Sequence, residues 1–203
     1  MRRADGAGSF GSMTITVRVA ERRDARAIAI VRIETWRAAY DGLIASEVLE
    51  RMDVDREAQR RADLWDDYHA DPRGAELLAE IDGEPAGWAA FGPSLDADLP
   101  DDGQVYAIYA LPRYWSAGVG HALMTDAEAR LRASGFTHAH LWVLDGNERA
   151  ASFYERHGWH EDGAVQDDDQ LIRGEHPQTL RERRRVRDLS GTFDPSAAGI
   201  RRP

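Results

Sequence analysis

The chain has 203 residues, 26 basic residues that are all arginine, and a formal net charge of −10 at pH 7. This length fits one domain with a sizeable core. The acidic balance argues against a nucleic-acid-binding protein, which needs a positive surface. The absence of cysteine excludes disulfides, a thiolate nucleophile and a cysteine-ligated zinc site.

No apolar run reaches the roughly 18 residues that a membrane span needs, so we expect no membrane partner. Residues 1–12 are rich in glycine and serine and lack the apolar segment of a secretory signal, which favours the cytoplasm. We expect a disordered N-terminal extension over residues 1–12, one domain over 13–187 and a flexible tail over 188–203.

Apolar patterning predicts alternating strands and helices along this domain. In the N-terminal half the expected elements are a strand at 15–20, a helix at 24–39, a broken helical region at 46–68, and strands at 76–82, 86–91 and 104–110. In the C-terminal half they are a helix from 119 to 133, a strand at 138–144, a helix at 148–157, and strands near 160–165 and 179–187. This order predicts an α/β protein with a mixed, twisted sheet and helices on both faces.

The most informative segment runs from Tyr109 to Ala122, where an apolar strand meets a loop that ends in Gly118-Val119-Gly120 before a helix begins. Glycines let the backbone turn and approach a ligand closely. The first N–H groups of the helix then bind an anion readily. The loop therefore predicts a phosphate or pyrophosphate site, with a simple tight turn as the alternative. A Walker A loop is excluded because the chain has no lysine, and the dinucleotide fingerprint fails because Leu123 replaces its third glycine.

A second segment, from Asn147 to Trp159, follows the strand at 138–144. Asn147 is a good helix N-cap, and Gly158 is a good residue to end the helix. Together with the glycine loop and the stretch Trp36–Ile44, this segment resembles the GNAT superfamily of acyl-CoA-dependent N-acyltransferases, of a bacterial type. The resemblance covers roughly residues 14–187. It implies the GNAT acyl-CoA N-acyltransferase fold, a central mixed twisted sheet flanked by helices.

The resemblance implies an enzyme, an acetyl-CoA-dependent N-acetyltransferase, with acetyl-CoA as cosubstrate and a small-molecule or peptide amine as acceptor. We expect no metal, and a homodimer is one option because dimers are common among similar proteins. Tyr154 is the implied general acid for the departing thiolate, and the Ala110 N–H is the implied oxyanion donor. The implied cofactor-binding residues are Tyr109, Ala110, Leu111, Ser116, Ala117, Gly118, Val119, Gly120, His121, Ala122, Asn147 and Tyr154.

The general base is not evident. An alkyl ammonium has a pKa near ~10.4 and must lose a proton before it attacks a thioester. Many family members carry a glutamate on the central strand, where Gln104 stands here, or on the strand before the asparagine, where Trp142 stands. Neither side chain takes a proton, so Asp145, Tyr106 or a water chain remain.

The acceptor site is expected near the first helices. Trp36, Tyr40, Gln104 and Tyr106 are the expected acceptor-binding residues, and core packing is the alternative for aromatic residues at helical spacing. Trp115 stands where the family often has glutamine or arginine, three residues before the first glycine of the loop.

Three further patterns have simpler explanations. His138 and His140 share one face of a strand, but no third metal ligand is apparent. The basic run 181–187 is expected to be an exposed edge strand, where arginines discourage unwanted pairing. The aspartates of 96–102 serve solubility, or attract a cationic amine if their loop lies near the acceptor cleft.

A second hypothesis is a non-catalytic acyl-CoA-binding module. Such a module keeps the glycine loop and lacks productive acid–base groups. The missing glutamates favour it, whereas Tyr154 argues against it. An acyl donor larger than acetyl also remains open.

Overall fold

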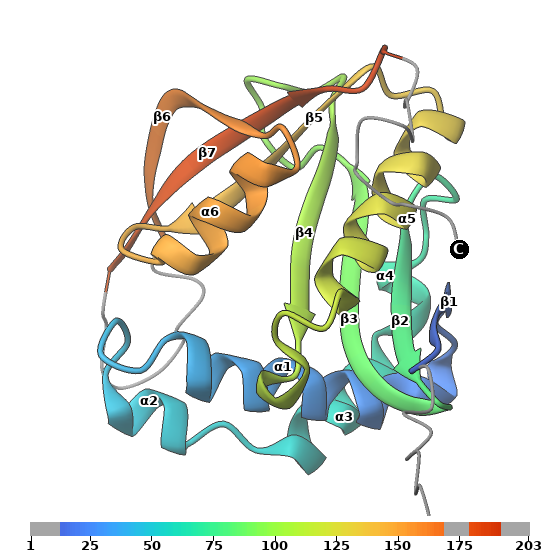
Figure 1. Ribbon diagram of the computed structural model, residues 1–203, viewed down its shortest axis with the longest axis vertical. Coiled ribbons are helices and arrows are strands. Elements are labelled where there is room, and N and C mark those ends of the chain that lie inside the picture. Colours follow the sequence, from blue (N-terminus) through green and yellow to red (C-terminus); the bar gives the residue numbers. More distant parts are fainter. Residues whose placement is uncertain (1–12, 169–178, 192–203) are drawn as a thin grey trace, which may run out of the picture.

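A seven-stranded sheet in the order β1-β2-β3-β4-β5-β7-β6 forms the centre of the protein (Figure 1). The structure is a computed structural model that describes residues 13–168 and 179–191, so the expected N-terminal extension and most of the expected tail lie outside it. Only β4 and β5 are parallel, and the other neighbouring strands are antiparallel, which confirms the predicted mixed sheet. The strands are β1 (Ile15–Val19), β2 (Ala75–Ile81), β3 (Glu84–Pro93), β4 (Gly103–Ala110), β5 (His138–Leu144), β6 (His160–Asp168) and β7 (Leu180–Asp188).

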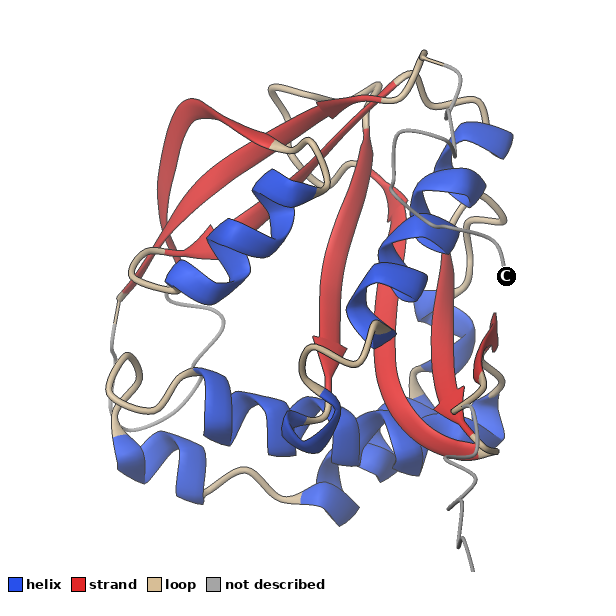
Figure 2. Cartoon of the chain, in the orientation of Figure 1, coloured by secondary structure: helices blue, strands red, loops and turns tan. Residues whose placement is uncertain are grey.

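Helices lie on both faces of the sheet (Figure 2). They are α1 (Ala25–Ala39), α2 (Ser46–Glu50), α3 (Val54–Asp63), α4 (Trp65–Tyr68), α5 (Val119–Ala133) and α6 (Glu148–Arg156). The expected break between α2 and α3 occurs because the Asp53 side chain accepts the Arg56 N–H at 2.7 Å and caps α3. Among the described helices, none combines the length and the apolar character that crossing a bilayer requires.

Each face of the sheet has its own core. On one face, Leu77 and Val105 pack against α5, whose apolar stripe of Leu123, Ala127 and Leu131 is fully buried. This stripe confirms the amphipathic helix predicted after the glycine loop. On the opposite face, Leu78, Trp88 and Ala90 pack with Ile28 and Val31 of α1. Successive strand residues alternate between these two cores, as the pleat of a sheet requires.

Strands β4 and β5 separate soon after they meet. Their ladder has only two residue pairs, Gly103 with Ala139 and Gln104 with His140. Beyond Gln104 the two fully described strands diverge, and the space between them widens towards the C-terminal end of β4 (Figure 1). A bulge at Tyr106 adds to the change in direction, because Val105 and Ala107 pair with consecutive residues of β3. The main chain of β4 near Ala110 therefore has no neighbouring strand on the β5 side.

The basic segment is a central strand, so the expected edge strand was wrong. β7 lies between β5 and β6, where each of its sides pairs with another strand. Arg184 binds Asp98 at 2.6 Å and Asp162 at 2.8 Å, and Arg185 binds Glu155 at 3.2 Å. These carboxylates come from the loop before β4, from β6 and from α6. The arginine run is compatible with burial because these distant carboxylates neutralise it.

Candidate active site

A cavity of about 1100 Å³ occupies the space where β4 and β5 separate. Its walls come from α1, β4, β5, β7, α6 and the glycine loop, so it reaches both faces of the sheet. The expected site residues that line it are Tyr109, Ala110, Ser116, Gly118, Gly120, His121, Asn147, Tyr154, Trp36, Tyr40, Gln104 and Tyr106. Leu111, Ala117, Val119 and Ala122 are not among the residues that line it.

The glycine loop has the conformation that an anion site needs. Gly118 is the N-cap of α5, with a left-handed φ of +93°, and no described side chain caps this helix. The Ala122 N–H makes an early helical bond, 3.0 Å long, to the Gly118 carbonyl. The N–H groups of Val119, Gly120 and His121 therefore have no partner inside the first turn. They point out of the helix at its positive end.

The second glycine also lets two helices touch. A Cβ at Gly120 would lie 3.3 Å from the ring of Phe153 on α6. Ser116 has a left-handed φ of +65°, which is unusual for a residue with a side chain. The loop conformation is thus constrained by the backbone at Ser116 and by the contact with Phe153 at Gly120.

The end of β4 presents main-chain groups to the cavity. The Leu111 N–H donates to the Ala86 carbonyl at 2.9 Å, so the Leu111 amide faces β3. Because main-chain groups alternate along an antiparallel pair, those of Ala110 face the space towards β5. The Ala110 carbonyl accepts the Thr35 hydroxyl at 3.0 Å and the Trp115 indole N–H at 2.8 Å. The neighbouring Ala110 N–H points the same way, and could stabilise a developing oxyanion.

Three phenols meet in the space between the diverging strands. Tyr154 on α6 is buried, and its pKa is raised above the ordinary value by burial first and then by the phenol of Tyr109. Burial also raises the pKa of Tyr40 well above its ordinary value, and a hydrogen bond with Tyr109 adds to the effect. Tyr40 and Tyr154 therefore keep their protons at neutral pH, so each can donate a hydrogen bond.

Residues 36–159 match the sequence model of the "Acetyltransferase (GNAT) family", and this match spans more than half of the chain. The chain belongs to the GNAT acetyltransferase family. It is therefore an acyltransferase enzyme.

This GNAT protein is similar to a curated relative in sequence and to solved structures in fold. The curated relative "Uncharacterized N-acetyltransferase YuaI" of Bacillus subtilis (strain 168) is 30% identical over 122 residues, which are 60% of this chain and 67% of that protein. The PaiA N-acetyltransferase of Thermoplasma acidophilum, solved in complex with coenzyme A, is 20% identical with a TM-score of 0.63 and covers 84% of this chain and 98% of that one. YncA of Salmonella typhimurium, a putative acetyltransferase solved with acetyl-CoA, is 19% identical with a TM-score of 0.60. The match covers 89% of this chain and 97% of that one.

Aromatic and basic side chains border the glycine loop of this GNAT protein. Sequence analysis selected His121 for the cofactor and noted Trp115, but it did not select Arg149 or His157. The Arg149 guanidinium lies 3.4 Å from the centroid of the Trp115 ring, and both side chains line the cavity. On the other side of the loop, His121 Nδ1 lies 3.4 Å from His157 Nε2. Burial and then His121 lower the pKa of His157 to about 4. Arg149 stands two residues after the Asn147 N-cap, a spacing that places it in the first turn beside the loop.

Asn147 has the capping role that its position predicts. Its side chain accepts the Ala150 N–H at 3.1 Å, at the start of α6. Asn147 also lines the cavity, so capping leaves it beside the space where a ligand would lie.

The expected acceptor residues lie on the α1 face of the sheet. Trp36 is 3% exposed and packs with Leu144, so the core-packing alternative holds for most of its ring. The Gln104 side-chain oxygen accepts the Leu95 N–H at 2.8 Å, and the Tyr106 hydroxyl donates to the Pro93 carbonyl. Gln104 and Tyr106 therefore hold the loop between β3 and β4 against the cavity.

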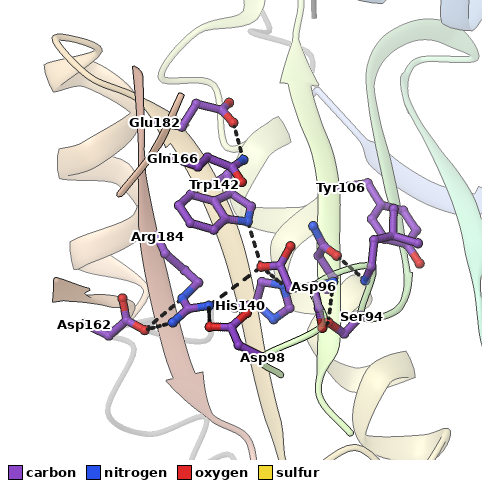
Figure 3. Close-up of polar contacts among 12 residues, drawn as sticks. Ser94, Asp96, Asp98, Tyr106, His140, Trp142, Asp162, Gln166, Glu182 and Arg184 are labelled. Atoms are coloured by element: carbon purple, nitrogen blue, oxygen red, sulfur yellow. Dashed lines mark hydrogen bonds and ion pairs between the residues drawn. The ribbon is translucent and has the colours of Figure 1, made fainter. Parts of the chain in front are cut away.

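The aspartate loop lies beside the cavity and is anchored there. Asp96 accepts the Trp142 indole N–H at 2.9 Å and lies 3.1 Å from His140 Nε2 (Figure 3). Burial lowers the pKa of His140, which keeps that side chain neutral in spite of the nearby aspartate. His138 is exposed, whereas His140 is fully buried. Within residues 13–168 and 179–191, no group of three histidine, aspartate or glutamate side chains could hold a metal ion.

The side chains expected to remove a proton are poorly suited to it. Asp145 is held by Arg183 at 2.8 Å, which lowers the pKa of this carboxyl. Burial and then the charge of Asp71 raise the pKa of Tyr106 to about 12. Asp145 is thus a weak base, and the phenol of Tyr106 is fully protonated near neutrality.

Proposed function

We propose that this protein transfers the acetyl group of acetyl-CoA to a primary amine of a small molecule or a peptide, by direct attack of the amine. One observation carries the proposal. Where β4 leaves β5, the Ala110 main chain, the Tyr154 phenol and the glycine loop all border one cavity. A thioester lying in this cavity would meet a hydrogen-bond donor for its carbonyl and another for its sulfur.

The glycine loop suits the pyrophosphate of the cosubstrate. The N–H groups of Val119, Gly120 and His121 leave the first turn of α5 without an intrahelical partner, and the helix dipole favours an anion there. Arg149 adds a guanidinium at the edge of the same cavity. Main-chain donors and one arginine would therefore bind the pyrophosphate without a lysine, which this chain lacks.

The chemistry needs an oxyanion donor and a proton for the thiolate. The Ala110 N–H supplies the first, and such a donor is worth roughly 3 kcal/mol when it is preorganised. Tyr154 supplies the second, because a protonated phenol can donate to a thiolate whose conjugate acid has a pKa near ~8.5. The raised pKa of Tyr154 means that the phenol holds its proton until the carbon–sulfur bond breaks.

Calorimetry with coenzyme A and thiol release from acetyl-CoA test this proposal together. We expect heat of binding with coenzyme A, and thiol release that depends on added primary amine. Absence of binding would overturn the assignment of the glycine loop. Binding without amine-dependent thiol release would overturn the transfer reaction and favour a binding module.

A further inference from the structure

Glu182 on β7 places a carboxylate in the acceptor half of the cavity. It lies opposite Leu144 of β5 and Gln166 of β6 in the sheet. Strand alternation puts its side chain on the same face as Leu144, which packs with Trp36 of α1. Glu182 is 8% exposed and is one of the residues that line the cavity.

The surroundings of Glu182 suit an ammonium group. The Gln166 side-chain N–H donates to the Glu182 carboxylate at 2.8 Å, and the Trp142 ring stands beside this pair (Figure 3). The Gln166 amide orients the carboxylate, and the Trp142 indole offers a face to a cation or an apolar stem. Arg184, two residues along the same face of β7, is bound by Asp98 and Asp162.

Glu182 is also within electrostatic reach of the phenols in the strand gap. Its charge is one of the influences that raise the pKa of Tyr40, after burial and the phenols of Tyr109 and Tyr154. Tyr40, Tyr109, Tyr154 and Glu182 all line the same cavity. A group bound at Glu182 therefore lies near the point where Tyr154 and the Ala110 N–H would hold a thioester.

We propose that the carboxylate of Glu182 binds the ammonium group of an alkylamine acceptor and removes the proton that prevents attack. This inference rests on the proposed acetyl transfer and assigns its missing general base. Glu182 takes one proton from the ammonium, and the lone pair released on nitrogen forms the carbon–nitrogen bond as the carbon–sulfur bond breaks. Tyr154 gives its proton to the sulfur, and the resulting phenolate takes the second proton from the nitrogen. Glu182 then releases its proton to water.

The other carboxylates of the cavity region have different tasks. Asp96 is fixed by Trp142 and closes one end of the acceptor side. Glu128 lines the cavity from α5, on the opposite face, and is held by Trp159 at 3.0 Å and by Arg187 at 3.3 Å. Asp96 is not among the residues that line the cavity, and Asp188 lines it at the last residue of β7, where its carboxylate accepts from Ser190. Glu182 is therefore the lining carboxylate that acts on the phenols.

The test compares Glu182→Gln with the full-length wild-type protein on two classes of acceptor. The alkylamines are benzylamine, tyramine, putrescine and glycinamide, which are ammonium ions at neutral pH. The arylamines are aniline and 4-aminophenol, which are neutral there and need no base before attack. Glu84→Gln is the matched control, since it removes one carboxylate from an exposed position at the start of β3.

We expect Glu182→Gln to lower kcat/KM for the best alkylamine by about 100-fold or more, as loss of a general base does. The same variant should change kcat/KM for arylamines less than about 3-fold, and a higher pH should restore part of the alkylamine rate. Glu182→Asp should keep more alkylamine activity than Glu182→Gln. Binding of coenzyme A by calorimetry should be unchanged in both variants, which shows that they fold.

Equal losses for alkylamines and arylamines would overturn the role of Glu182, as would no loss. Acetylation of arylamines alone by the wild-type protein would overturn it too. If the wild-type protein binds coenzyme A but acetylates none of the alkylamines, the inference on Glu182 fails while the cofactor site stands. Absence of coenzyme A binding, in contrast, would overturn the proposed function itself.

Discussion

The indole N–H of Trp115 donates a 2.8 Å hydrogen bond to the main-chain carbonyl of Ala110. This bond connects the glycine loop to the end of β4. The proposed pyrophosphate site and the proposed oxyanion donor are therefore held at a fixed distance from each other. The Thr35 hydroxyl binds the same carbonyl at 3.0 Å from α1. Two side chains from different elements therefore fix the orientation of the residue whose N–H would serve the oxyanion.

Removing either donor should weaken catalysis modestly. Trp115→Phe keeps a ring beneath Arg149 and loses the hydrogen bond, and Thr35→Val loses the hydroxyl at nearly constant volume. We expect each change to lower kcat about 5-fold, the equivalent of one net hydrogen bond of about 1 kcal/mol. Steady-state kinetics with the best amine measures this effect. Because both bonds end on Ala110, the double variant should lose more than either single one, and an unchanged kcat in all three would contradict the positioning role.

Tyr154→Phe should separate catalysis from cofactor binding. The phenol is buried in the strand gap, and its ring packs in the core with Trp159, so phenylalanine preserves the packing. We expect kcat to fall by about 100-fold, within the range for loss of a general acid. Calorimetry should give nearly the same affinity for coenzyme A. Tyr68→Phe, on the exposed end of α4, is the control, and an equal rate for Tyr154→Phe and wild type would remove the acid role.

The sequence predicted the elements well because local patterns determine them. The stripe of Leu123, Ala127 and Leu131 gave the helix after the glycine loop, and the strand expected at 138–144 has the observed limits of β5. The divergence of β4 from β5 has no such local signal. No local pattern around Gln104 reports where a parallel ladder ends.

Residues that depend on long-range pairing escaped prediction. Glu182 stands in an arginine-rich run, and the expectation of an exposed edge strand removed it from consideration. Its place in the cavity follows from β7 inserting between β5 and β6, a non-local choice that a single strand does not encode. The same holds for the aspartate loop, whose position depends on Arg184 and Trp142 as partners.

Gly118→Ala should weaken coenzyme A binding beyond its effect on folding. Gly118 has a φ of +93°, and Gly83 in the β2–β3 hairpin has a similar φ of +87° with nothing near its missing side chain. Both substitutions by alanine should destabilise the protein by roughly 1 kcal/mol, because the left-handed conformation costs that much with a Cβ. Only Gly118→Ala should reduce the affinity for coenzyme A, by about 10-fold or more if the N–H groups lose alignment. Equal affinities for the two variants would contradict a binding role for the loop.

The stability of the protein should fall as the pH drops below the ordinary range of histidine, in part because of His157. Burial and His121 lower the pKa of this side chain to about 4, whereas an unfolded histidine has a pKa near ~6.5. The unfolded chain therefore binds a proton first, so stability present above pH ~6.5 is lost as the pH falls towards the folded pKa. With allowance for solvent screening, this contribution is about 1–2 kcal/mol.

His157→Asn should flatten this pH dependence, since asparagine does not titrate. Urea unfolding at several pH values between neutrality and the folded pKa measures the difference in free energy of unfolding between variant and wild type. His160→Asn, at an exposed position on β6, is the control for replacing a histidine. His140 is also buried and neutral, but it is present in all three proteins, so subtracting the curves isolates His157. Parallel curves for wild type and His157→Asn would show that burial and His121 do not lower the pKa of His157.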